Sequence, residues 1–197
     1  MREAVKRKRR PGRVFVVAGP SGVGKTTLCK KALEALQGRL HWSISHTTRP
    51  QREGEVDARD YHFVSAEKFE RMVGRDEFIE HATVHDNYYG TSRKELRRIH
   101  KSGGDALVEI DVQGALQIIE TFPEAVMIFI LPPTLKALEQ RLRGRGTDSP
   151  AVIRKRLQNA YGEIAEAPAF RYQIVNEDLD HALADLIGVV HAEACRV

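Results

Sequence analysis

The feature that most constrains this chain is a glycine-rich segment, Gly19-Pro-Ser-Gly-Val-Gly-Lys-Thr26, between the apolar run Val14–Ala18 and the helical pattern Lys25–Leu36. The segment satisfies G-x-x-x-x-G-K-[ST], the pattern of a phosphate-binding loop (P-loop). Its glycines let successive backbone N–H groups face one centre, and the helix N-terminus adds the positive end of a dipole. A strand, this loop and a helix in that order predict a site for a nucleoside triphosphate. The pattern does not identify the acceptor of a phosphoryl group.

Residues of the loop have distinct chemical tasks. Lys25 can reach the β- and γ-phosphates, and the hydroxyl of Thr26 can bind Mg²⁺. We therefore expect ATP as the ligand, with Mg²⁺ as the cofactor bound to it. The predicted ATP-binding residues of this segment are Gly19, Pro20, Ser21, Gly22, Val23, Gly24, Lys25, Thr26 and Thr27.

Five short apolar runs predict the strands of a sheet: Val14–Ala18, Trp42–Ser45, Ala106–Ile110, Val126–Leu131 and Tyr172–Val175. Four are continuously apolar, as expected for parallel strands buried on both faces, whereas Trp42–Ser45 alternates. Helical patterns occur between or after them at Lys25–Leu36, Val112–Glu120, Leu135–Arg143, Ala151–Ala165 and Leu179–Ala194. This alternation predicts an α/β fold with a parallel five-stranded sheet of the P-loop NTPase type, flanked by helices.

Residues from about 47 to 92 interrupt this rhythm. They contain the short apolar runs Tyr61–Val64 and Phe78–Val84, with a helix beginning after Ser65 between them. We expect a small mixed α/β insertion that binds the acceptor. The core is then expected to comprise residues 13–46 and 93–197.

A second irregular stretch, Gly144–Pro150, is rich in Gly, Arg and polar residues and separates two helical patterns. It predicts a short helical lid over about residues 141–156, with Gly144 and Gly146 as hinges.

The net charge of +4 is unevenly distributed along the chain. Residues 1–13 hold seven basic side chains and one acid, and the remainder carries slightly more acids than bases. We expect residues 1–12 to be a solvated, disordered basic tail, so nucleic acid is not an expected partner. Weak nucleic-acid contact, a nuclear-type signal and an organelle presequence are the alternatives for this tail.

The two cysteines, Cys29 and Cys195, do not form a disulfide framework, which indicates a reducing cytoplasm. No apolar run approaches the roughly 20 residues of a membrane span, so no membrane association is expected. His81 and His85 have metal-pair spacing on a helix but lie in a strand-like run. No structural metal is expected.

Two acids follow the third predicted strand, in Leu107-Val-Glu109-Ile-Asp111. Acids at the carboxyl end of a buried parallel strand face the ligand crevice. Glu109 suits a Walker-B-like role that supports Mg²⁺ indirectly. The alternative for Asp111 is that it caps the helix beginning at Val112.

Ordered motifs make the chain similar to guanylate kinases. These motifs are Ser45-His-Thr-Thr-Arg49-Pro-Gln-Arg52-Glu-Gly-Glu55, Asp60-Tyr61-His-Phe63, Glu77-Phe-Ile-Glu80, Asn87-Tyr-Tyr-Gly90-Thr91, Asp111-Val-Gln-Gly114 and Val175-Asn176-Glu-Asp178. With the P-loop, the resemblance covers about residues 13–197. It implies transfer of the γ-phosphoryl group of ATP to GMP or dGMP, giving ADP and GDP, in purine nucleotide metabolism.

The resemblance also implies roles for side chains, and their chemistry agrees. Two arginines can grip the GMP phosphate bidentately, phenols can donate to the same phosphate, and the Glu80 carboxylate can accept the N1–H and N2–H₂ donors of guanine. The GMP-binding residues expected are Ser45, Arg49, Arg52, Tyr61, Glu80, Tyr89, Thr91, Glu109 and Asp111. The catalytic residues expected are Lys25, Arg49, Arg141, Arg145 and Arg156. Asn176 is expected beside the adenine, whereas His46 and Asp86 depart from the small hydroxyl residue and the glycine expected at their positions.

Two other functions are open at this point. The first is another P-loop phosphotransferase, such as an adenylate or small-metabolite kinase, against which the pair Ser45 and Glu80 argues. The second is a binding module, like the guanylate-kinase-like domains of scaffold proteins, against which Lys25, Thr26 and the lid arginines argue. Expected partners are ATP and GMP, and the sequence leaves open whether the chain forms a homo-oligomer.

Overall fold

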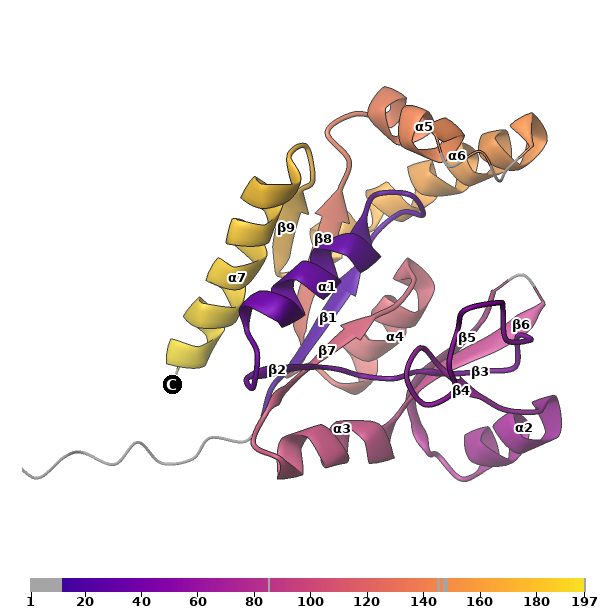
Figure 1. Ribbon diagram of the computed structural model, residues 1–197, viewed down its shortest axis with the longest axis vertical. Coiled ribbons are helices and arrows are strands. Elements are labelled where there is room, and N and C mark those ends of the chain that lie inside the picture. The colour runs from indigo at the N-terminus through magenta and orange to yellow at the C-terminus, as the bar shows by residue number, and fades with distance from the viewer. Residues whose placement is uncertain (1–11, 85, 145, 147–148, 197) are drawn as a thin grey trace, which may run out of the picture.

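The computed structural model describes residues 12–84, 86–144, 146 and 149–196 (Figure 1). At its centre a five-stranded sheet has the order β2-β7-β1-β8-β9, with every neighbouring pair parallel. The strands are β1 (Val14–Ala18), β2 (Leu40–Trp42), β7 (Asp105–Glu109), β8 (Val126–Leu131) and β9 (Tyr172–Val175). All five residues of β1 are buried, as their continuous apolar sequence predicts. The predicted α/β class is confirmed.

Helices cover both faces of this sheet. On one face α1 (Lys25–Ala35) and α7 (Leu179–Cys195) lie side by side, and α3 (Arg93–Lys101) and α4 (Val112–Thr121) pack against the other (Figure 1). Because successive side chains of a strand point to opposite faces, Phe15 and Val17 join the α1 layer while Val14 and Val16 join the α4 layer.

Two further helices, α5 (Leu135–Gly144) and α6 (Pro150–Ala165), extend from the sheet between β8 and β9 (Figure 1). Leu138, Leu142 and Ile153 anchor them to the core on the α1 side. Ser149 caps the start of α6 and Pro150 occupies its first turn, which fixes where that helix begins. A short 3₁₀ helix, Ala167–Ala169, then leads to β9.

The stretch between β2 and α3 forms a second, smaller layer. Its elements are β3 (His46–Thr47), β4 (His62–Phe63), α2 (Ala66–Gly74), β5 (Phe78–Val84) and β6 (Asn87–Ser92). They make a mixed four-stranded sheet, β4-β3-β6-β5, with its own core of Phe69, Met72 and Phe78. Gln117 of α4 links this helix to the edge strand β5 through two hydrogen bonds. Its side-chain amide donates to the His81 carbonyl at 2.9 Å and accepts from the His81 N–H at 3.2 Å.

The predicted strand Trp42–Ser45 is misplaced. β2 runs from Leu40 to Trp42, where Leu40 is buried in the core, and the chain then leaves the sheet toward the cleft described below. Among the described residues no helix is both long and apolar enough to cross a membrane.

Candidate active site

A cleft of about 1230 Å³ separates the P-loop from the small sheet. Its walls come from the loop, the start of α1, the β7–α4 junction, β5, β6 and one face of α6. The predicted site residues that line it are Gly19, Ser21, Gly22, Gly24, Lys25, Thr26, Thr27, Ser45, Tyr61, Glu80, Tyr89, Glu109, Asp111 and Arg156. The fold therefore brings together loop residues and insertion residues that lie far apart in the sequence.

The curl of the P-loop depends on glycines. Gly19, Gly22 and Gly24 have φ angles of 143°, 89° and 100°, conformations that side-chain-bearing residues rarely adopt. A Cβ at Gly19 would lie 2.4 Å from the Ile130 carbonyl oxygen, and one at Gly24 would lie 2.6 Å from Asn176 Nδ2. Backbone conformation and space both require glycine at these two positions.

The Lys25 side chain is hydrogen-bonded to the backbone of its own loop. Its Nζ donates to the carbonyl oxygens of Gly19 at 2.7 Å and Pro20 at 3.1 Å. Burial lowers the pKa of Lys25, and the nearby carboxylates Glu109 and Glu163 oppose that shift. The ammonium group is thus held in place by weak carbonyl acceptors, which an incoming phosphate can replace.

Thr26 and Glu109 form the second polar pair. Thr26 Oγ1 donates to Glu109 Oε1 at 2.7 Å. Burial raises the pKa of Glu109, and the Thr26 hydrogen bond and Lys25 oppose that shift. A hydroxyl and a carboxylate are the oxygen ligands that Mg²⁺ prefers. The described residues contain no cluster of three or more His, Cys, Asp or Glu that would hold a metal alone. This pair fits a cation that also takes ligands from a nucleotide.

Glu80 is the most unusual group in the cleft. It is 4% exposed, and its Oε1 has no hydrogen-bond partner among the described residues. Burial raises the pKa of Glu80 to about 7, with Asp111 adding to the shift and Thr91 opposing it. A buried carboxylate with a free acceptor is costly unless a ligand donor completes it.

Neighbouring residues set the position of the Glu80 carboxylate. A Cβ at Gly114 would lie 2.7 Å from Glu80 Oε2, so glycine is what permits this carboxylate position. The Ser45 and Thr91 hydroxyl oxygens lie 3.5 Å apart nearby. Thr91 itself is fully buried and lies behind the cleft wall. Asp111 both lines the cleft and caps α4, accepting the Gly114 N–H at 2.8 Å, so its alternative role as a cap is present too.

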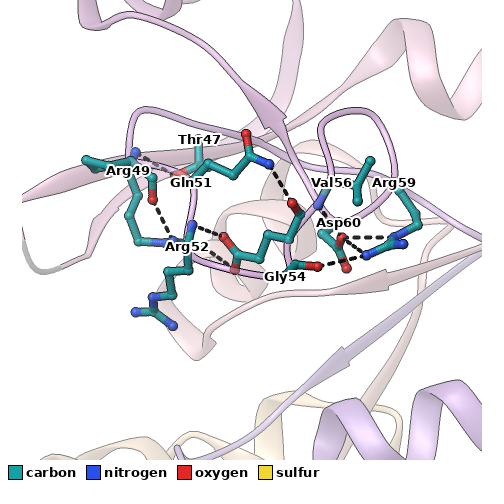
Figure 2. A network of polar contacts seen from close by, with 10 residues as sticks. Thr47, Arg49, Gln51, Arg52, Gly54, Val56, Arg59 and Asp60 are labelled. Atoms are coloured by element: carbon teal, nitrogen blue, oxygen red, sulfur yellow. Dashed lines mark hydrogen bonds and ion pairs between the residues drawn. The ribbon is translucent and has the colours of Figure 1, made fainter.

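Arg49 and Arg52 are not among the residues that line the cleft. Figure 2 shows the network that holds them: Arg49 Nη2 donates to Glu55 Oε1 at 2.7 Å, and the Arg52 N–H donates to Glu55 Oε2 at 2.8 Å. The Arg49 guanidinium also stacks 5.5 Å from the ring centre of Tyr61, a cleft residue. The Arg52 guanidinium extends away from the network (Figure 2).

The lid arginines have different positions. Arg141 donates to the carbonyl oxygens of Asn176 at 2.8 Å and Val23 at 3.2 Å, and it is not among the residues that line the cleft. Asn176 is buried there, and its side chain donates to the same Val23 oxygen at 2.8 Å. Arg156 lines the cleft and its Nη1 donates to Ser21 Oγ at 3.2 Å. Arg145 lies outside the described residues.

Sequence reasoning missed two carboxylates. Glu55 ends the motif quoted above, and its spacing from Arg49 and Arg52 in one short loop was the available signal. Glu163 lines the cleft from α6, and its signal was a spacing of seven residues from Arg156, which places both on one helix face.

A P-loop and the buried carboxylate of Glu80 face one another across one cleft. This arrangement defines a nucleoside monophosphate kinase. Comparison with known proteins agrees with this class. The chain belongs to the guanylate kinase family, whose sequence profile matches residues 11–193.

Individual relatives cover nearly the whole chain. The guanylate kinase of Thiobacillus denitrificans is 50% identical over 182 residues, 92% of this chain and 87% of that protein. The guanylate kinase of Neisseria gonorrhoeae is 48% identical over 188 residues, 95% of this chain and 90% of that one.

Solved structures agree with the fold. The guanylate kinase of Anaplasma phagocytophilum superposes with a TM-score of 0.76 at 35% identity, covering 94% of this chain and 88% of its own. The SH3-kinase fragment of tight junction protein 3 covers 93% of this chain and 59% of its own, with a TM-score of 0.51 at 12% identity, which is a likeness of fold alone.

Proposed function

We propose that this chain transfers the γ-phosphoryl group of ATP to GMP or dGMP, giving ADP and either GDP or dGDP in purine nucleotide metabolism. The observation that carries this proposal is the buried carboxylate of Glu80, with an unpartnered oxygen, in the cleft that the P-loop faces. Guanine offers N1–H and N2–H₂ side by side, so it can satisfy both carboxylate oxygens. Adenine offers no such pair, and a site built for a hydrogen bond rejects ligands that lack it.

The donor nucleotide is proposed to bind along residues 19–27, with its phosphates on the loop N–H groups and Lys25, and with Asn176 beside the adenine. Thr26 would hold Mg²⁺, with Glu109 supporting it indirectly. When bound, this ion supplies positive charge to the phosphate oxygens.

The acceptor phosphate is proposed to be held by the Arg49 and Arg52 guanidinium groups and the Tyr61 and Tyr89 phenols. That phosphate is already an anion, so attack in line on the γ-phosphorus requires alignment rather than a strong general base. Binding would exchange the Glu55 carboxylate, now on Arg49, for the substrate phosphate.

The lid helices complete the site in this proposal. Arg141, Arg145 and Arg156 would bring positive charge over the transferring group, and closure would exclude water from it.

The two cysteines are unpaired, with Cys29 buried, which supports a reducing cytoplasmic setting.

The test compares GMP, dGMP, AMP, CMP and shikimate as acceptors in an assay that couples ADP release to a signal. GMP and dGMP are expected to be used, and the other three are not. Glu80→Ala is expected to raise the KM for GMP by at least about tenfold while the KM for ATP changes little, since one charge-assisted pair is lost. Full discrimination of GMP from AMP by this variant would show that the base pocket lies elsewhere.

A further inference from the structure

The strand that carries Glu80 is an edge strand, and a side chain of α4 takes the place of a further strand beside it. β5 ends the order β4-β3-β6-β5, and the outer backbone groups of an edge strand have no partner strand. Here the His81 N–H donates to Gln117 Oε1 at 3.2 Å, and the His81 carbonyl accepts from Gln117 Nε2 at 2.9 Å. One carboxamide therefore satisfies both outward backbone groups of the residue that follows Glu80, as a residue of an adjacent strand would.

The backbone of β5 is irregular where it carries Glu80. Between Phe78 and Glu80 the strand advances by two residues while its partner β6 advances by one. Ile79 is thus the extra residue of a β-bulge, a feature that re-aims neighbouring side chains. Phe78 packs in the core of the small sheet, Ile79 packs in the main core beside α4, and Glu80 lines the cleft. The direction of the Glu80 carboxylate therefore depends on how this short piece of backbone is held.

α4 holds that backbone on both sides of Glu80. Gly114, Gln117 and Thr121 are spaced by three and four residues, which places them on one face of the helix. Gln117 binds the residue after Glu80, as described above, and Thr121 binds the residue before it. The Thr121 Oγ1 lies 3.2 Å from the Ile79 carbonyl oxygen, although it also lies 2.8 Å from the Gln117 carbonyl oxygen of its own helix. Because one hydroxyl hydrogen is shared between two carbonyls, the two bonds of Gln117 are the firmer attachment.

Two roles for Gln117 have different consequences. If Gln117 only joins the small sheet to α4, its loss lowers stability and weakens all acceptors alike. If Gln117 sets the direction of the Glu80 carboxylate, its loss selectively weakens a base that needs both carboxylate oxygens in place. Guanine presents two donors to them, N1–H and N2–H₂, whereas hypoxanthine presents N1–H alone. A comparison of these two bases therefore separates the two roles.

We propose that Gln117 is a positioning residue for the base of the acceptor: it holds the backbone after Glu80 against α4, which keeps both carboxylate oxygens in line with the two donors of guanine. This inference deepens the proposed function and rests on it. Gln117 is not among the described residues that line the cleft, so it acts through Glu80 and not on the substrate. The preference for guanine over hypoxanthine then depends on a side chain that does not contact the base.

The test measures kcat/KM of the full chain for GMP and for inosine monophosphate in the assay of ADP release. Gln117→Met keeps an unbranched side chain that suits a helix and removes both hydrogen bonds. The ratio of the two kcat/KM values is expected to fall about fivefold to tenfold, the equivalent of one well-aligned hydrogen bond. The KM for ATP is expected to stay within about twofold, because Gln117 holds the acceptor side of the cleft.

Glu120→Met is the matched control. Glu120 is an exposed residue of the same helix and is not among the described residues that line the cleft. The same new side chain at this position is expected to leave the ratio of GMP to inosine monophosphate within about twofold of the wild type. Thr121→Val keeps the shape of its side chain and removes the bond to the Ile79 carbonyl, so a smaller fall of about twofold to threefold is expected.

An unchanged ratio in Gln117→Met would overturn the inference and leave the proposed function intact, and so would an equal fall in Glu120→Met. A wild-type chain that does not phosphorylate GMP would instead overturn the proposed function. Thermal unfolding of each variant establishes that the compared chains are folded. If Gln117→Met does not fold, the ratio in Thr121→Val decides the matter, since an unchanged ratio there would show that the attachment to α4 does not aim Glu80.

Discussion

Single residues of the cleft show how burial changes chemistry. Burial disfavours the charged forms of both Glu80 and Lys25. Both side chains line the cleft, where a bound ligand of opposite charge or with hydrogen-bond donors would favour the charged form again. Such shifts are typical of functional sites, although structural ion pairs also produce them. At Glu80 the geometry adds an unpartnered oxygen, which an ordinary structural carboxylate would not keep.

The pKa of Glu80 predicts a pH dependence of GMP binding. Only the ionised carboxylate accepts both guanine donors, so affinity is expected to rise with pH up to about 7 and then level off. Calorimetric titration with guanosine between pH 5.5 and 8.5, in roughly half-unit steps, measures this without interference from the phosphate pKa near 6. Glu80→Gln is the control and is expected to lose the step; an equal step in that variant would contradict the assignment.

The same group predicts a pH dependence of folding stability. Its pKa is higher in the folded chain than the ordinary 4.5, so the folded state binds the proton more tightly. The contribution of Glu80 to the free energy of unfolding is therefore present at low pH and is lost as pH rises from about 4.5 to about 7.

His46 predicts the opposite trend. Its ring lies 4.6 Å from that of His62, its Nδ1 is buried without a hydrogen-bond partner among the described residues, and burial together with the His62 charge lowers its pKa to about 4. Lys68 and Lys94 lower it further and Glu95 opposes them. The unfolded chain takes up the proton first as pH falls from 6.5 toward 4, so stability is lost over that range.

Urea unfolding at pH 7.5 and pH 5 tests this. His46→Ser, which restores a small hydroxyl residue, is expected to reduce the acid-induced loss of unfolding free energy by about 1–2 kcal/mol. Equal losses in both proteins would show that His46 does not titrate in this range.

Lys25 predicts a separation of binding from turnover. Lys25→Ala is expected to abolish phosphoryl transfer, because no other side chain of the loop carries a positive charge to the β- and γ-phosphates. GMP binding, measured by calorimetry without ATP, is expected to stay near the wild-type value. A variant that retained turnover would contradict the donor site.

At the scale of elements, the contact between α4 and β5 sets the proposed base pocket. Gly114 in α4 leaves the space that the Glu80 carboxylate fills, since a Cβ there would lie 2.7 Å from Glu80 Oε2. Alanine is better than glycine inside a helix by about 1 kcal/mol. Gly114→Ala is therefore expected to keep the melting temperature while raising the KM for GMP about tenfold by moving Glu80.

The control for this prediction is Gly188→Ala in α7, where a Cβ meets no atom within 4 Å. It is expected to gain the same helix stability without any change in the KM for GMP. An unchanged KM for GMP in Gly114→Ala would show that GMP binding does not depend on the present position of the Glu80 carboxylate.

Elements with a strong local pattern could be predicted from the sequence, and the others could not. The runs Val14–Ala18 and Val126–Leu131 match β1 and β8 residue for residue because buried parallel strands are continuously apolar. The run Tyr172–Val175 also matches β9, although this edge strand buries only Ile174. The helix α3 was missed because it is mostly charged, with only Leu96 and Ile99 as its buried apolar residues.

The short strands β3 and β6 were missed for a different reason. His46–Thr47 has two residues, and Asn87–Ser92 is polar, so their pairing depends on neighbours rather than on local preference. Asp86, just before β6, has a φ of +63°, which explains physically why glycine suits that position.

Within the site, the sequence could predict which residue types would meet but not how they are held. Lys25, Tyr61 and Glu80 line one cleft, as expected from residues that are distant in the chain. The attachment of Arg49 to Glu55 and of Arg141 to Asn176 is a matter of side-chain geometry that no spacing specifies. Their roles in catalysis stay predictions until they are tested with substrates.

At the scale of the whole molecule, one cleft is proposed to hold both nucleotides end to end. A compound that joins adenosine to guanosine through a polyphosphate chain is then expected to raise the melting temperature more than ATP and GMP at the same concentrations. The linked ligand gains affinity because its second half binds at high effective concentration, and stabilisation grows with the logarithm of ligand over Kd. A rise no larger than that with ATP alone would mean that the two sites are not aligned.

The strand order has a kinetic consequence. The P-loop follows β1 at the middle of the sheet, the small sheet is inserted between β2 and β7 on one side, and α5 and α6 are inserted between β8 and β9 on the other. If the donor binds the P-loop and the acceptor binds the small sheet, as proposed, the two approach the central strand from different directions and neither has to pass through the place of the other. Either nucleotide can enter first, so initial rates measured at several fixed concentrations of one substrate should follow a random-order sequential scheme.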